Sequence, residues 1–114
     1  MYVMNRQNVE EQILDLRSRG KTYAEIADSF NSSGVDSPSG KKKWTQYTIS
    51  KFVQRREVAH LITELLNRMS PEHIAIKFNV ENVRLSTDTK EKEWSAKKIR
   101  RFLKTEQIDH DTYD

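Results

Sequence analysis

Cysteine is absent from this 114-residue chain, glycine and proline are scarce at three and two residues, and no long apolar run occurs. Without cysteine the chain can form neither disulfides nor thiolate nucleophiles nor the commonest structural zinc sites. The three glycines cannot build a phosphate-cradling loop. No window approaches the roughly 18 to 20 apolar residues of a membrane span, and the N-terminus does not follow the pattern of a secretory signal. These absences predict a soluble cytoplasmic protein that contacts no membrane.

Residues suited to catalysis are also sparse. The three histidines, His60, His73 and His110, are not spaced as metal ligands on a helix, and each is expected at the surface. We therefore expect no enzyme activity, no cofactor and no metal site.

Charge is plentiful but unevenly placed. Hydrophobic residues make up 35% of the chain and charged residues 32%, a composition that suits two small cores better than one large core. The net charge is only +3, yet residues 41–56 hold six basic side chains and no acid. Residues 84–104 hold eight basic side chains and three acids. These two concentrations of positive charge predict two surfaces that face a polyanion.

One sequence pattern occurs twice. IADSFNSSGV at 26–35 shares five of its ten residues with IAIKFNVENV at 74–83, at an offset of 48 residues. WTQYTISKFV at 44–53 and WSAKKIRRFL at 94–103 then share Trp, Ile and Phe at an offset of 50 residues. Two unrelated segments would not share both patterns in the same order. The repeat predicts two copies of one module, each expected to perform the same task.

Capping patterns place the helices of both modules. Two capping boxes begin helices over about 9–19 and 23–32; they are Asn8 with Glu11, and Thr22 with Glu25. Thr45 caps the third helix. The second module keeps this backbone chemistry with other residues: Ser70 replaces Thr22, Asn82 replaces Gly34, and Ser95 replaces Thr45.

The link between the modules admits two interpretations. No glycine or proline separates the third helix from a helix predicted over about 57–69, but the apolar stripe shifts to the opposite side. Either the helix breaks near 55–57, or one long helix packs on a different core with each half. The fold class expected is all-α, with about six helices in two tandem three-helix helix-turn-helix modules over 1–56 and 57–104. Residues 105–114 are expected to form an acidic, disordered tail.

The first module resembles the helix-turn-helix segment in the recombinase domain of large serine integrases. The resemblance rests on these residues: Gly20, Thr22, Ile26, Ala27, Asn31, Gly34, Val35, Ser37, Pro38, Gly40, Trp44, Thr48 and Ile49. In that family the segment implies binding of a DNA attachment site, with the helix after the tryptophan in the major groove. The second module matches more loosely, because Arg68 replaces Gly20 and the proline and second glycine have no clear counterparts.

Departures from the family limit what the resemblance implies. The chain has no room for a catalytic resolvase domain, no cysteines for a zinc ribbon, and no Tyr-x-Gly run after the third helix. We therefore expect the DNA-binding part alone, duplicated.

The helical period separates two faces of each third helix. In the first module Tyr47, Lys51 and Gln54 lie opposite the core with Ser50 beside them; in the second, Lys97, Arg101 and Lys104 lie opposite with Arg100 beside them. Gln and Ser can bind base edges, whereas lysines suit phosphate oxygens, although arginine also binds guanine. The hypothesis is that the first module supplies sequence preference and the second supplies electrostatic affinity.

Other residues have competing interpretations. The loop lysines contact the DNA backbone or are merely solvated, and Tyr47 contacts DNA or solvent. Trp44 and Trp94 are expected to fill the small cores instead of stacking on bases. The complete set of predicted DNA-binding residues is Lys41, Lys42, Lys43, Gln46, Tyr47, Ser50, Lys51, Gln54, Arg55, Lys90, Lys92, Lys97, Lys98, Arg100, Arg101 and Lys104.

The function predicted from these observations is sequence-specific binding of double-stranded DNA by a monomer or weak dimer in the nucleoid. Such a protein would act as a bacterial or mobile-element transcriptional regulator, or as an accessory factor for recombination or replication. The alternative is an adaptor that docks on a polymerase or a recombinase. Binding of structured RNA is a third interpretation, but the sequence offers no platform of stacking aromatics.

Overall fold

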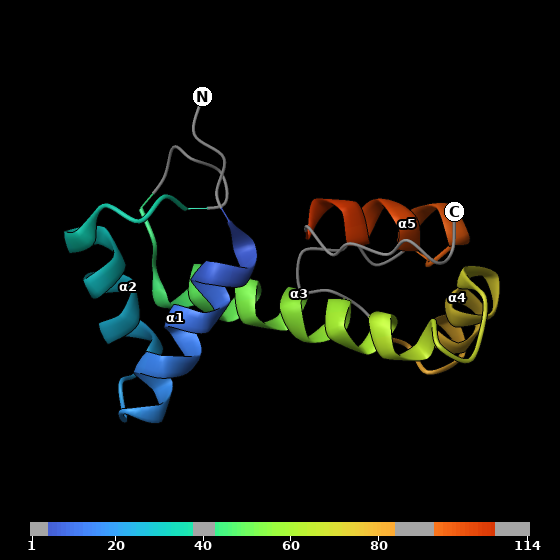
Figure 1. Cartoon of the computed structure of the whole chain (residues 1–114), viewed down its shortest axis with the longest axis horizontal. Coiled ribbons are helices and arrows are strands. Elements are labelled where there is room, and N and C mark those ends of the chain that lie inside the picture. The colour runs from blue at the N-terminus through green and yellow to red at the C-terminus, as the bar shows by residue number, and fades with distance from the viewer. Residues whose placement is uncertain (1–4, 38–42, 84–92, 107–114) are drawn as a thin grey trace. The chain divides into compact units, whose positions relative to one another are not determined.

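The computed structural model describes residues 5–37, 43–83 and 93–106, which contain five helices and no strand (Figure 1). The helices are α1 (Arg6–Ser18), α2 (Tyr23–Ser33), α3 (Gln46–Leu65), α4 (Pro71–Val80) and α5 (Ala96–Thr105). The all-α prediction is confirmed for this part of the chain. The chain divides into two compact units, Met1–Val53 and Gln54–Asp114, so each unit includes part of α3.

Of the two interpretations of the link, the structure has the second: α3 runs unbroken through residues 55–57 and packs on a different core with each half. The expected count of about six helices is therefore not met among the described residues, which form five. The first half of α3 buries Ile49 and Phe52 in the first unit, and the second half buries Ala59 and Ile62 in the second unit. The apolar stripe therefore shifts where α3 changes from one core to the other. The helix remains continuous because no residue in between interrupts its backbone hydrogen bonds.

The first helix begins one turn earlier than predicted. Its N-cap is Asn5, whose side chain accepts a hydrogen bond from the backbone N–H of Asn8 at 3.0 Å, so the predicted cap at Asn8 is wrong. Asn5 and Asn8 are equally good cap residues in sequence. The added turn carries Arg6, whose guanidinium lies 5.8 Å from the ring centroid of Phe52 in the first unit. This contact with a distant residue favours the earlier start.

The other predicted caps and left-handed ends are confirmed, but the helix predicted over about 57–69 ends four residues earlier, at Leu65. Thr22 and Glu25 form the reciprocal capping box, with distances of 2.8 Å and 3.2 Å. Positions 34 and 82 both adopt the left-handed conformation, with φ of 76° at Gly34 and 57° at Asn82. The remaining caps accept hydrogen bonds as predicted from the third residue after each; they are Thr45, Ser70 and Ser95. Local sequence therefore sets most of the helix boundaries.

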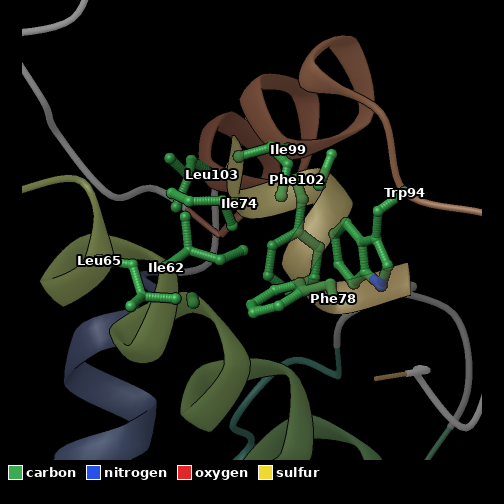
Figure 2. Packing of buried hydrophobic residues seen from close by; sticks show 10 residues of the cluster. Ile62, Leu65, Ile74, Phe78, Trp94, Ile99, Phe102 and Leu103 are labelled. Carbon is green, nitrogen blue, oxygen red and sulfur yellow. The ribbon is translucent and has the colours of Figure 1, made fainter. Parts of the chain in front are cut away.

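Each unit has its own apolar core. In the second unit, side chains from α3, α4 and α5 converge with Trp94 in one cluster, as Figure 2 shows. The first unit contains an equivalent cluster from α1, α2 and the first half of α3. Phe30, Trp44 and Phe52 stack edge to face in the first unit at centroid distances of 5.2 and 5.8 Å. Their counterparts in the second unit, Phe78, Trp94 and Phe102, do the same at 5.3 and 5.7 Å.

The second unit also buries an ion cluster that the sequence analysis did not predict. Arg56 and Glu106 are 2% and 0% exposed. The Nε of Arg55 donates to Oε2 of Glu106 at 2.7 Å, and a guanidinium N–H of Arg56 donates to the backbone carbonyl of Glu106. The predicted tail therefore begins too early, because Thr105 belongs to α5 and Glu106 is buried. Residues 107–114 lie outside the described residues.

Candidate nucleic-acid interface

A tryptophan and an asparagine fix the start of α3 in the first unit. The side-chain amide of Asn31, in α2, donates to the backbone carbonyl of Trp44 at 2.9 Å and accepts from its backbone N–H at 2.9 Å. The indole N–H of Trp44 donates to the carbonyl of Val35 at 3.0 Å. These three bonds span the loop between α2 and α3. They hold the N-terminus of α3 in place relative to α2.

The second unit makes the same three bonds with the corresponding residues. Asn79 bonds the backbone of Trp94 at 2.9 Å and 2.8 Å, and the indole N–H of Trp94 donates to Val83 at 2.7 Å. Trp44 and Trp94 are 2% and 3% exposed, which confirms their expected place in the cores. Neither ring is available to stack on a base. The helices that follow each tryptophan, α3 and α5, are the elements that these bonds position.

The first turns of α3 present polar side chains to solvent. We call Gln46, Tyr47, Ser50 and Lys51 the polar face of α3. Tyr47 is 61% exposed, and the Lys51 ammonium lies 4.0 Å from its ring centroid. A cation at this distance from an aromatic face is attracted to the ring, so the pair forms one amphipathic unit on the surface. Gln54, two turns from the start of α3, is only half-buried and has interactions within the protein.

Four cations lie on the side of α5 that faces away from the core. We call them the cationic face of α5: Lys97, Arg100, Arg101 and Lys104. Their spacing puts them in one stripe along the helix, and α5 contains no acidic residue. Nη2 of Arg100 lies 3.4 Å from a carboxylate oxygen of Glu72 in α4. The pKa of Glu72 is held below its ordinary value, first by a hydrogen bond from its own backbone N–H and further by Arg100.

Two predicted contacts lie elsewhere in the second unit. The ammonium of Lys98 lies 4.6 Å from the ring centroid of Trp94 and is half-buried on the flank of α5. Arg55 pairs with Glu106 and stacks 4.6 Å from the ring centroid of Phe102, with its side chain 24% exposed. Both side chains pack on the aromatic core that supports α5. Their alkyl stems and charges contribute to that packing, whereas the residues of the cationic face point away from the core.

The loop lysines are described only in part. Lys43 is exposed immediately before Trp44. Lys41, Lys42, Lys90 and Lys92 lie outside the described residues.

Neither a metal-binding group nor a membrane-spanning helix occurs in the part of the chain that the structure describes. No group of three histidine, aspartate or glutamate residues among residues 5–37, 43–83 and 93–106 is placed to hold a metal ion. Within the same residues, no helix has the length and apolar character needed to cross a membrane.

Residues 5–59 match the family model described as Recombinase. The match relates this segment, just under half of the chain, to recombinases. It covers α1, α2 and most of α3 and ends before α4 and α5. No curated protein and no solved structure matches the chain.

The sequence analysis did not identify the residues that hold the helices of the candidate interface in position. Asn31 and Asn79 recur in the repeat, and this recurrence was a usable signal for a shared structural role. Arg56 falls where the apolar stripe of α3 would continue, which was a signal for burial. Glu106 is its counterpart at the offset of 50 residues. No sequence pattern indicated that these two residues of opposite charge pair with one another.

Proposed function

We propose that the chain binds double-stranded DNA through two helix-turn-helix modules that arose by tandem duplication. In the first module α2 and the start of α3 form the motif, and in the second module α4 and α5 form it. The recombinase match supports the first module. The matching tryptophan–asparagine bonds support the second, because they place α5 as α3 is placed. The protein would act in recombination, or in regulation of a mobile element, as a non-enzymatic DNA-binding factor.

The observation that carries this proposal is the cationic face of α5. Four exposed cations in a stripe, with no acid in the helix, suit the regularly spaced phosphates of a duplex. The ion pair between Arg100 and Glu72 is exposed, so solvent screens it and it contributes little to stability. A phosphate oxygen can replace that carboxylate at little cost.

The two modules differ in what they offer to DNA. Gln46 and Ser50 are exposed near the N-terminus of α3, the part of a recognition helix that contacts base edges in helix-turn-helix proteins. A glutamine side chain can bind adenine through two hydrogen bonds. We therefore assign sequence preference to the polar face of α3 and electrostatic affinity to the cationic face of α5. Two modules on one chain would let a monomer engage DNA without dimerising.

A salt titration tests the proposal directly. Binding of the whole chain to a fluorescein-labelled 30-base-pair duplex is measured by anisotropy between about 50 and 300 mM KCl. Each neutralised phosphate contributes about 0.9 to the slope of log affinity against log salt. The variant Lys97→Glu with Arg101→Glu should lower the slope by about 1.8 and weaken binding to all sequences alike. The variant Gln46→Ala should relax preference at one or two positions and leave the slope unchanged.

A matched control separates the interface from net charge. Arg19→Glu with Lys21→Glu makes the same change in charge at exposed residues of the first unit outside both faces. This control should retain most of the affinity. Equal losses in both charge-reversal variants would show a non-specific effect of net charge. Absence of duplex binding at low salt would refute the proposal and favour an adaptor that binds protein.

A further inference from the structure

The second helix of each unit presents an outer surface that has diverged between the two units. On α4, Ile76 and Val80 are 61% and 77% exposed and lie one helical turn apart on the side opposite the core. We call these two side chains the α4 patch. At the offset of 48 residues, the same positions of α2 hold Asp28 and Ser32, both exposed. The scaffold therefore does not require apolar side chains at these positions.

A shallow hollow adjoins the α4 patch. It lies between the end of α3 and α4, and its lining residues are Arg68, Met69, Ser70, His73, Ile76 and Lys77. The equivalent hollow of the first unit has a different lining: Leu16, Lys21, Glu25, Ile26, Asp28, Ser29 and Ser32. The hollow beside α4 thus combines apolar and basic side chains and has no carboxylate in its lining. The hollow beside α2 has two carboxylates.

Charge decides the kind of partner that this surface fits. Arg68 and Lys77 border the apolar residues, and each makes an intrahelical ion pair, with Glu64 at 3.9 Å and with Glu81 at 2.7 Å. Such exposed pairs are worth only about 0.3 to 0.5 kcal/mol, so carboxylates of a bound partner can compete for both cations. The surface therefore favours apolar side chains bordered by acidic ones.

Size argues against a second copy of this chain as the occupant. A stable protein–protein interface buries roughly 800 Å² on each partner. Two exposed aliphatic side chains and a shallow hollow offer only a small apolar surface. They match the footprint of a single amphipathic helix, which buries residues at positions i and i+4 in a groove.

We propose that the α4 patch and the adjoining hollow bind an acidic amphipathic helix of a partner protein. The apolar side chains of that helix would cover Ile76 and Val80, and its carboxylates would pair with Arg68 and Lys77. The patch adjoins the cationic face of α5, because Glu72 lies one turn before Ile76 and pairs with Arg100. The inference uses none of the residues of that face, so it does not depend on the proposed binding of DNA.

The test uses two synthetic helical peptides and the ¹⁵N-labelled full chain. Each 16-residue peptide has leucines at positions i, i+4 and i+7; one is flanked by glutamates and the other by lysines at the same positions. The acidic peptide should shift the amide signals of residues 68–80, with a dissociation constant of about 0.1 mM, a magnitude suited to a small interface. The basic peptide should bind at least tenfold more weakly.

Substitutions taken from the other unit provide the critical variant. Ile76→Asp with Val80→Ser gives α4 the side chains that α2 has at those positions, so folding should be retained, as circular dichroism would show. This variant should bind the acidic peptide at least tenfold more weakly and should bind duplex DNA as the parent does. The control Leu14→Ser removes another exposed apolar side chain, 57% exposed on α1, and should change neither property.

Three results would overturn the inference. The first is equal binding of the acidic and basic peptides, or peptide-induced shifts confined to residues outside 64–81. The second is self-association of the parent chain in sedimentation experiments that Ile76→Asp with Val80→Ser abolishes, because the patch would then bind a second copy. The third is loss of duplex binding in the same variant, which would place the patch in the DNA interface. A parent chain that binds the acidic peptide but no duplex would refute only the proposed function.

Discussion

Replacing Glu106 should destabilise the second unit strongly, because its carboxylate compensates two arginines. The Arg56 side chain is 2% exposed, so removing the carboxylate takes an ion-pair partner from a buried cation. Arg55 is 24% exposed and can partly turn to water, so most of the cost arises at Arg56. Breaking one partner of a buried pair typically costs about 3 to 5 kcal/mol. That is a large share of the roughly 5 to 15 kcal/mol that stabilises a small domain.

The assay is urea unfolding followed by tryptophan fluorescence. In a Trp44→Phe background only Trp94 reports, and this residue belongs to the core of the second unit. With a urea m-value of about 1.5 kcal/mol/M, Glu106→Ala should lower the midpoint by at least about 2 M. The control Glu81→Ala breaks an exposed i,i+4 pair with Lys77 and should cost at most about 0.5 kcal/mol.

A double variant separates charge compensation from packing. Arg56→Met with Glu106→Leu replaces the buried pair with apolar side chains of similar size. Such replacements are often neutral or stabilising by about 1 to 4 kcal/mol. The double variant should therefore be much more stable than Glu106→Ala. If both variants lost the same stability, or if Glu106→Ala lost less than about 0.5 kcal/mol, the reasoning from an uncompensated cation would be wrong.

Three further results are expected from the helix ends and the loops. Asn31→Ala and Asn79→Ala each remove two hydrogen bonds to a tryptophan backbone and should lower the free energy of unfolding by about 1 to 3 kcal/mol in urea titrations; equal stability would refute their positioning role. Gly34→Ala forces a side chain into φ of 76° and should cost about 1 to 2 kcal/mol, whereas a neutral result would show that the α2 end relaxes. A hydrogen bond from the Thr22 backbone N–H lowers the pKa of Glu25 below 4.5. The stabilisation of the fold by the Glu25 carboxylate is therefore present above that pH and is lost as the pH falls through the folded-state pKa. Glu25→Gln should remove this acid dependence from thermal unfolding curves; an unchanged pH profile would contradict the assignment.

Local sequence predicted most helix boundaries because the groups that end a helix are neighbours in the chain. The box of Thr22 with Glu25 and the left-handed positions Gly34 and Asn82 all involve interactions within a few residues. The start of α1 was misplaced because Glu11 completes a box with Asn8, whereas no glutamate stands three residues after Asn5. A contact between Arg6 and Phe52, 46 positions apart in sequence, distinguishes them.

Helical periodicity, which is also a local property of the sequence, predicted which side chains of the candidate interface face outward. The helical period separated outward from inward side chains on α5, and its cationic face is exposed as expected. Period alone could not assign Lys98 and Arg55, which lie at the borders of their faces. Arg55 packs on the ring of Phe102, 47 positions away, whereas Lys98 packs on the ring of Trp94, four residues before it.

The sequence by itself determined the repeated framework of the two modules: helix caps, left-handed helix ends, a core tryptophan and apolar stripes. Only the tertiary structure decided that α3 is continuous across the two cores and that Arg56 and Glu106 are buried together. Helix capping and periodicity are local properties, so a few neighbouring residues specify them. Whether a charged side chain can be buried depends on an opposite charge that folding brings close, and here that partner lies 50 positions away in the sequence.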